Sequence, residues 1–217
     1  ASTKNIINAA TKAGIPLVFV NRRPDQKDLP KDVVAVTSDD VEAGKLQMQY
    51  IAEKLGGKGK IVILLGDLAN NSTTNRTKGV KEVLAKYPDI KIEQEQTGIW
   101  LRDKGMTLVN DWLTQGREFN AVLANNDEMA IGAMQTLKNQ GIRIPEDMSV
   151  TGFDDIAYAK YSDPSLTTIS QPAEEMGKMA MDMLLKVIEG EPLSQRECVL
   201  PTEFIIRKST GPLLAKK

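Results

Sequence analysis

Short runs of apolar residues alternate along the chain with longer segments that place an apolar side chain at every third or fourth position. The runs contain Val, Ile and Leu without polar alternation, which is typical of strands covered on both faces. They span residues 15–20, 33–37, 60–65, 90–93, 121–124, 148–152, 166–169 and 203–207. Strands separated by helices favour an α/β fold with Rossmann-like, doubly wound parallel sheets.

Amphipathic segments fill the gaps between these runs and predict helices over residues 40–55, 73–86, 103–116, 127–140 and 172–189. The last segment carries methionines at helical spacing, Met176, Met179 and Met183, and Ile188 continues the same face. Methionine commonly fills irregular gaps in a protein core. We therefore predict that this face is core and not a ligand surface.

Polar or aromatic residues follow the ends of many predicted strands. The set comprises Asn21, Arg22, Arg76, Trp100, Asn126, Asp154 and Gln171. Asn and Gln offer donors and acceptors, Asp accepts hydrogen bonds in pairs, and Arg donates as a rigid fork. An indole face can cover the C–H face of a sugar ring. Because the carboxyl ends of parallel strands open onto the ligand crevice, these residues predict a site for an uncharged, polyhydroxylated ligand.

The composition excludes several classes of function. The sequence has no histidine and a single cysteine, Cys198, which leaves no Ser-His-Asp triad, Cys-His pair, His-ligated metal or internal disulfide. The net charge is −1 without a basic block, so charge gives no case for nucleic acid or an anionic membrane. No apolar stretch approaches the ~18 residues of a membrane span, and we expect no signal peptide within these residues. We predict a binding protein without cofactor or metal, not an enzyme.

Other candidate sites are better explained as structural features. Residues 66–70 occupy the place of a phosphate loop but lack its Gly-Lys-Ser/Thr ending, which predicts an ordinary loop and argues against a flavodoxin-like enzyme. Residues 56–60 precede a strand and predict a helix C-terminus. For the pair Asp154 and Asp155, no third acidic metal ligand is evident, so we predict one ligand acceptor and one helix cap. Asn126 or its neighbour Asp127 is predicted to cap a helix, which is compatible with a ligand contact.

Segments of the chain resemble two related families. VFVNR (18–22), KGKIVILLG (58–66) and NNDEMAIGA (125–133) are similar to ribose-type periplasmic sugar-binding proteins. Residues 144–156 (IPEDMSVTGFDDI), 166–172 and 205–210 resemble the effector domain of lactose-repressor-type regulators. The two families share the type I periplasmic-binding-protein fold, which the resemblance therefore predicts for this chain.

That resemblance implies two lobes joined by three crossovers, near residues 23–38, 170–172 and 200–203. It implies a complete C-terminal lobe of residues 38–170 and 201–217. The N-terminal lobe is then partial, with residues 1–37 and 171–200, and its first βα units would precede Ala1. In this mapping Asn21 and Arg22 lie on the partial lobe, and Gln171 lies at the hinge. The other site residues, which are Arg76, Trp100, Asn126 and Asp154, lie on the complete lobe.

The function implied by the resemblance is that of a solute receptor that closes on its ligand and delivers it to a membrane ABC-type permease, in the periplasm. The alternative is the cytoplasmic effector domain of a repressor that lacks its DNA-binding headpiece, so no nucleic acid is expected as a partner of this chain alone. Asn21 replaces the acidic residue common in ribose binders, which leaves a pentose, a hexose or an inositol open as the ligand.

A partial lobe would leave apolar surface uncovered. The strand 15–20 and the helix 172–189 are expected to pack on units that the chain lacks, which would expose a strand edge and the Met/Leu stripe. We therefore expect self-association, or a separate N-terminal fragment, to cover this lobe. Because one of the two lobes that would close on the ligand is only partial, the sugar affinity of the chain alone is expected to be weak.

Overall fold

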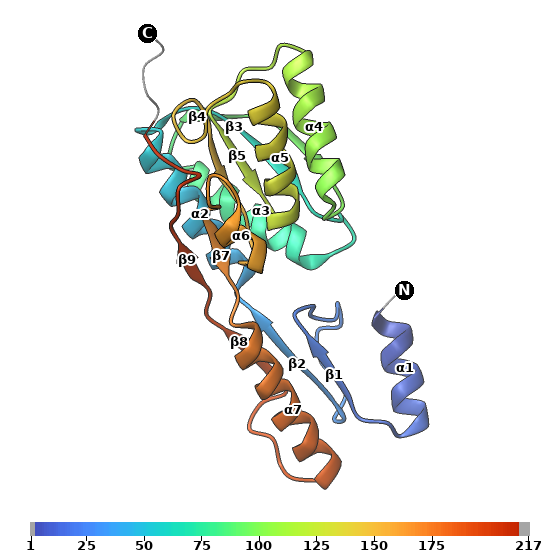
Figure 1. Cartoon of the computed structure of the whole chain (residues 1–217). Helices are drawn as coiled ribbons and strands as arrows, with labels where there is room; N and C mark the ends of the chain where they lie inside the picture. Colours follow the sequence, from blue (N-terminus) through green and yellow to red (C-terminus); the bar gives the residue numbers. More distant parts are fainter. Residues whose placement is uncertain (1–2, 213–217) are drawn as a thin grey trace. The chain divides into compact units, whose positions relative to one another are not determined.

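The computed structural model describes residues 3–212, which fold into two compact units (Figure 1). Unit 1 contains residues 3–39 and 171–202, and unit 2 contains residues 40–170 and 203–212. In this described part, no helix is both long and apolar enough to cross a membrane.

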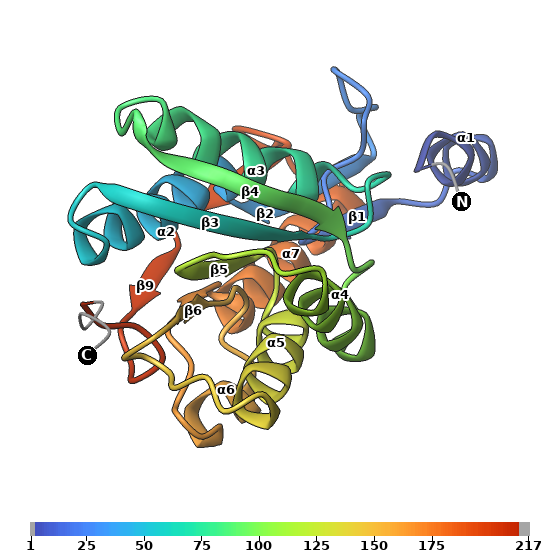
Figure 2. The same cartoon turned by 90° about the horizontal axis from the view of Figure 1, so that it is seen from above.

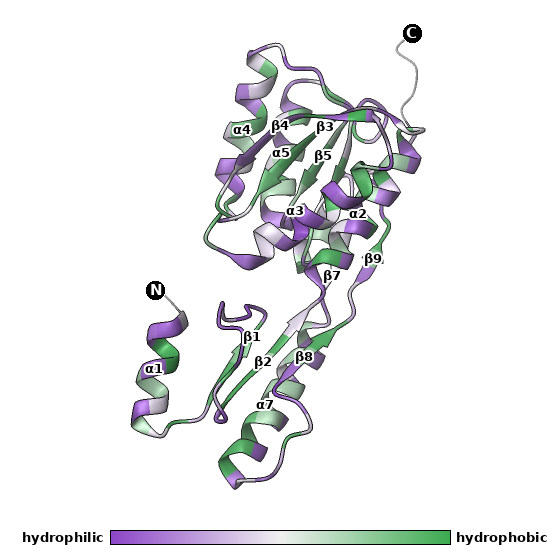
Figure 3. Ribbon diagram, turned by 180° about the vertical axis from the view of Figure 1, so that it is seen from behind, coloured by the Kyte–Doolittle hydropathy of each residue, from purple (hydrophilic) through white to green (hydrophobic). Residues whose placement is uncertain are grey.

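Unit 2 is built on a four-stranded parallel sheet in the order β4-β3-β5-β6. Its strands are β3 (Lys58–Leu65), β4 (Asp89–Thr97), β5 (Ala121–Ala124) and β6 (Ser149–Thr151). The central strands β3 and β5 are largely apolar, whereas the edge strand β4 is polar (Figure 3). This difference follows from position, because the central strands are covered on both faces and the edge strand meets solvent.

Helices cover both faces of the unit 2 sheet (Figure 2). One face packs against α2 (Asp40–Lys54) and α3 (Asn71–Leu84), and the other against α4 (Arg102–Thr114) and α5 (Asp127–Asn139). All four helices agree with the predicted segments to within two residues, because each carries the apolar face that the sheet buries. The predicted helix C-terminus at residues 56–60 is confirmed: α2 ends at Lys54, and Gly56 and Gly57 both have positive φ.

The last strands depart from the predicted parallel arrangement. The strands β7 (Thr168–Ser170) and β9 (Glu203–Ile205) pair antiparallel as a separate two-stranded sheet. Isolated parallel bridges also join this pair to the end of β6, at Thr151–Thr167 and at Asp154–Ser170. A short helix, α6 (Ala157–Tyr161), lies between β6 and β7 and was not predicted, since it has only five residues.

Unit 1 contains a three-stranded parallel sheet in the order β1-β2-β8. Its strands are β1 (Leu17–Val20), β2 (Val33–Ser38) and β8 (Glu197–Leu200), and its helices are α1 (Thr3–Ala13) and α7 (Ala173–Glu189). Alternate residues of β2 face opposite ways. Val34 and Val36 belong to the cluster under α7, and Val33 and Ala35 belong to the cluster with Ile7 of α1.

Two of these elements were missed in the sequence. The helix α1 ends in a left-handed Gly14, and the Ile15 N–H donates to Ala10 O, so Ile15 closes a helix and does not begin a strand. The strand β8 is only four residues long, and its burial is uneven, which hides it among polar neighbours.

The helix α7 corrects one expectation and confirms part of another. Met176 and Met183 are buried against the sheet of unit 1, so this face is core as predicted and does not await a missing unit. Ile188, predicted on the same face, is exposed. Together with Met181 and Leu185 it forms a different, exposed apolar stripe.

Candidate functional site

The carboxyl ends of β3, β4, β5 and β6 bring together four of the seven predicted site residues. Arg76 lies near the start of α3, which follows β3, and Trp100 follows β4. Asn126 follows β5, and Asp154 follows β6. Because parallel strands end at the same edge of the sheet, residues far apart in the sequence meet there. We call these four residues the Arg76 cluster.

Arg76 is the centre of the cluster and is only 3% exposed. Its Nε lies 2.8 Å from Oδ1 of Asp40, and its Nη1 donates to the Asn125 carbonyl oxygen at 2.6 Å. The same Nη1 lies 3.6 Å from Oδ1 of Asp154. Two carboxylates therefore balance a buried charge, which would otherwise be very costly to keep away from water.

Aromatic rings also flank the guanidinium of Arg76. Its Cζ atom lies 3.4 Å from the centroid of the Phe153 ring and 5.6 Å from that of Trp100. Cation–π contacts of this kind fix the plane of the guanidinium as well as its position. Asp40 and Phe153 are neighbours of Arg76 that the sequence reasoning missed. Phe153 precedes Asp154 directly, whereas Asp40 resembles an ordinary acidic residue in the first turn of α2.

Trp100 is held in place by an unusual backbone turn after β4. Ile99 and Trp100 both have positive φ, 46° and 69° respectively, which costs non-glycine residues about 1–3 kcal/mol each. The indole lies against Gly66 at the end of β3, where an added Cβ would come within 2.1 Å of Trp100 Cη2. Such stored strain is typical of binding sites.

Asn126 caps α5, as predicted. Its Oδ1 accepts from the Met129 N–H at 3.0 Å, and its Nδ2 donates to the Trp100 carbonyl oxygen at 3.0 Å. The side chain therefore joins the turn after β4 to the start of α5. An amide has two donor hydrogens and two acceptor lone pairs, so one of each is left over for a ligand.

The two adjacent aspartates have different roles. Asp154 adopts φ 110°, and its carboxylate is 31% exposed beside Arg76. Asp155 pairs with Arg207 instead, at 2.6 Å between Oδ1 and Nη2. The prediction that one of them caps a helix is wrong, because the N-cap of α6 is Ile156 and no side chain bonds there.

Asp127 lies behind the cluster and is fully buried. Its Oδ1 accepts from the Thr168 hydroxyl, and its Oδ2 accepts from the Ile156 N–H at 2.9 Å. Burial raises the pKa of Asp127 to about 7, and the nearby Asp154 and Asp155 add to this rise, while the two hydrogen bonds oppose it. Asp127 thus ties the loop after β6 to β7.

The other three predicted site residues belong to unit 1. Asn21 follows β1 with φ 67°, and its N–H donates to the Val36 carbonyl oxygen. Arg22 comes next and is exposed. The Gln171 side chain accepts from the Ser38 hydroxyl at 2.8 Å.

The segment 66–70 is an ordinary loop between β3 and α3, as predicted. Asn70 caps α3 by accepting from the Ser72 N–H at 3.0 Å. Among the described residues, no group of three or more His, Cys, Asp or Glu side chains is placed to hold a metal ion.

Comparisons with known proteins are consistent with this geometry. A protein of Rhizobium meliloti with the name "Putative rhizopine-binding protein" is 41% identical to this chain. The match covers 95% of this chain and 68% of that protein. A similar solved structure is the solute-binding protein of an ABC transporter from Bacillus halodurans with bound myo-inositol. Its TM-score is 0.85 at 31% identity, and the match covers 94% of this chain and 70% of that protein's chain.

A regulator of the LacI family from Enterococcus faecium, solved with ribose, has a TM-score of 0.83 at 28% identity. The match covers 98% of this chain and 77% of that regulator's chain. The chain spans 42% to 59% of the length of four other curated relatives that it matches. The type I periplasmic-binding-protein fold is thus confirmed, with relatives among both solute-binding proteins and regulators. Residues 1–192 match the family model described as "Periplasmic binding protein domain", and the chain belongs to that family.

Proposed function

We propose that this chain binds a small uncharged sugar or cyclitol, which can be a pentose, a hexose or an inositol. The Arg76 cluster is the observation that carries the proposal, because it gathers donors, acceptors and an indole at one sheet edge. Inositol and ribose in solved relatives of the same fold support this ligand class.

Each member of the cluster has a suitable role. Arg76 uses Nε and Nη1 for Asp40 and Asn125, so its remaining donors are available to a ligand hydroxyl. Asp154 can accept from an adjacent hydroxyl, since its carboxylate is partly exposed. The partly exposed indole of Trp100 provides an apolar face for ring C–H groups.

We propose that the ligand is clamped by hinge closure, with Asn21, Arg22 and Gln171 of unit 1 supplying the remaining contacts. In this role the protein is the receptor of an ABC-type sugar transporter, it acts in the periplasm, and it catalyses no reaction. The higher identity to a binding protein than to any of the repressors compared supports this choice.

The alternative is the effector domain of a cytoplasmic regulator, in which the same pocket would change DNA affinity. Residues 144–156 favour it, because they resemble the effector domain of lactose-repressor-type regulators. In the gene, a secretory signal upstream of Ala1 supports the receptor, and a helix-turn-helix supports the regulator.

Titration calorimetry of a full-length parent protein that contains this chain tests the ligand class. The probes are myo-inositol, D-ribose and D-allose, with ribose 5-phosphate and D-glucuronate as anionic counterparts. We expect heat from at least one neutral probe, with an affinity that Arg76→Ala and Asp154→Ala each reduce by about 2 kcal/mol or more, since each removes a charged hydrogen-bond partner from a desolvated hydroxyl. Binding of the anionic probes alone contradicts the proposal, as does unchanged affinity in both variants.

A further inference from the structure

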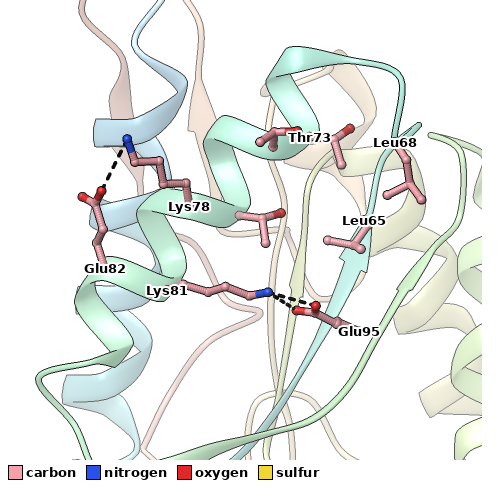
Figure 4. A pocket seen from close by; sticks show the side chains of 9 residues that line it. Leu65, Leu68, Thr73, Lys78, Lys81, Glu82 and Glu95 are labelled. Atoms are coloured by element: carbon pink, nitrogen blue, oxygen red, sulfur yellow. Dashed lines mark hydrogen bonds and ion pairs between the residues drawn. The ribbon is translucent and has the colours of Figure 1, made fainter.

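A cleft on unit 2 lies outside the Arg76 cluster, between α3 and the β3-β4 edge of the sheet (Figure 4). Its volume is about 580 Å³, which is within the ~300–1,000 Å³ typical of small-molecule sites. Residues of β3, the following loop, α3 and β4 line it, among them Leu65, Leu68, Thr73, Thr77, Lys81 and Glu95.

The charged groups of the cleft neutralise one another. Lys81 Nζ lies 2.8 Å from Oε2 of Glu95, and the pair crosses from α3 to β4 (Figure 4). Lys78 Nζ lies 3.7 Å from Oε1 of Glu82 on the same helix. The lining carries two lysines and two glutamates, so it offers an ion no surplus of either charge. The electrostatics therefore favour a neutral occupant.

Thr77 supplies an unsatisfied polar group at this cleft. The residue is 9% exposed, and its buried Oγ1 has no hydrogen-bond partner among the described residues. Thr73, one turn earlier, differs because its Oγ1 donates to the Asp67 carbonyl oxygen at 2.7 Å. Threonine in a helix populates two χ1 rotamers, and a change of rotamer exchanges the positions of Oγ1 and the methyl group. A polar ligand atom at the cleft would therefore give this hydroxyl the partner that it lacks.

The remaining lining residues are two leucines and the exposed Thr74. Leu65 contributes from β3, and Leu68, which is 64% exposed, contributes from the following loop. Solvent-exposed leucine beside threonine methyl groups favours an apolar ligand body. A peptide strand added to β4 is disfavoured, because Glu93 and Glu95 place charges along that edge.

We propose that this cleft is a second ligand site, for a neutral small molecule that has an apolar body and one hydrogen-bonding group. The apolar body covers Leu65 and Leu68, and the polar group pairs with the Thr77 hydroxyl. The proposal does not depend on the sugar site, because no residue of the Arg76 cluster lines the cleft.

Backbone and methyl NMR of the isotope-labelled chain tests this proposal with three probes of one shape. They are 2-naphthalenemethanol, which is neutral, 2-naphthoate and 2-naphthylmethylammonium. We expect saturable shifts for the neutral alcohol, centred on Leu68, Thr73 and Thr77, and at least fivefold weaker binding of either ion. Myo-inositol added throughout is expected to leave these shifts in place. Equal binding of the three probes, or shifts centred elsewhere, would overturn the proposal.

Substitutions then test the role of the hydroxyl. Thr77→Val keeps the shape and removes Oγ1, and we expect it to weaken binding of the alcohol at least threefold. Leu68→Lys places a charge at the exposed side of the cleft and is expected to do the same without loss of fold. Thr107→Val on α4 is the matched control, since the Thr107 hydroxyl already donates to Asp103. Unchanged affinity in both Thr77→Val and Leu68→Lys, in proteins with otherwise native spectra, would overturn the assignment.

Discussion

The guanidinium carbon of Arg76 lies 3.4 Å from the centroid of the Phe153 ring. This stacking contact joins α3 to the segment after β6, because Arg76 lies on α3 and Phe153 lies just beyond the end of β6. It also explains how the chain holds Arg76 and Asp154 within 3.6 Å of each other while Asp40 neutralises the arginine from α2. Contacts within unit 2 therefore fix the geometry of the Arg76 cluster.

Replacing Arg76 is expected to reduce stability as well as binding. Arg76→Ala leaves the side chain of Asp40, 12% exposed, without its cation, and breaking such a buried pair typically costs about 3–5 kcal/mol. Arg76→Lys keeps the charge but loses the planar fork and the stacking on Phe153, so only part of the stability returns. Urea unfolding measures both variants. A loss below about 1 kcal/mol in Arg76→Ala would contradict a structural role for this pair.

Asp154 and Asp155 provide a matched pair of substitutions. Asp154→Ala is expected to weaken sugar binding about 30-fold or more, the equivalent of ~2 kcal/mol, with little effect on unfolding. Asp155→Ala is expected to destabilise the fold by about 2 kcal/mol, because Arg207 loses its partner, and to leave the intrinsic affinity nearly unchanged. Calorimetry and urea unfolding of both variants separate the two effects. The reverse pattern would show that we have exchanged their roles.

Gly66 is expected to tolerate no side chain. In Gly66→Ala the new Cβ would lie 2.1 Å from Trp100 Cη2, so the indole must move, at a cost of about 1–3 kcal/mol. Tryptophan fluorescence is expected to shift, since Trp100 moves while Trp112 stays buried in the core of unit 2. Gly177→Ala on α7 is the control: nothing lies within 4 Å of its added Cβ, and helix propensity favours alanine by about 0.5–1 kcal/mol. An unshifted spectrum in Gly66→Ala would mean that the indole does not rest on Gly66.

Asp127 gives the protein a defined pH dependence. Its pKa rises from 3.8 to about 7 on folding, so the folded state binds the proton more tightly than the unfolded state between these values. The contribution of Asp127 to stability is then expected to fall as the pH rises through this window, by about 4 kcal/mol, and to level off above it. Urea unfolding at a series of pH values measures this slope.

Asp127→Asn is expected to remove that slope, whatever its effect on absolute stability. Asp163→Asn is the control: Lys138 lowers the pKa of this exposed carboxyl, so its contribution is lost only as the pH falls below the range tested. A wild-type slope that persists in Asp127→Asn would show that another group titrates.

The sequence predicts the central part of unit 2 because local and tertiary signals agree there. Ala121–Ala124 is an uninterrupted apolar run and forms β5 with the same bounds. Asn126 follows it, next to acidic residues, and caps α5. Each of these features depends on residues close together in the chain, so a pattern can reveal them.

The contacts that shape the site could not be predicted in the same way. Arg76 and Asp40 are 36 positions apart, and Arg76 sits in a polar segment that gives no sign of its burial. The left-handed turn at Ile99 and Trp100 also breaks local preference, because a β-branched residue rarely takes positive φ. Tertiary packing decides both features.

The exposed stripe on α7 is expected to cause self-association. Met181, Leu185 and Ile188 are 55%, 45% and 60% exposed, and they lie on one face because their spacing is close to the helical repeat. A contiguous apolar face in water favours burial against another such face. Sedimentation velocity is expected to show a mass that rises with protein concentration, and Leu185→Lys combined with Ile188→Glu is expected to abolish this rise. Leu68→Lys, an exposed leucine outside the stripe, is the control. A monomer at every soluble concentration of the wild-type chain would contradict the prediction.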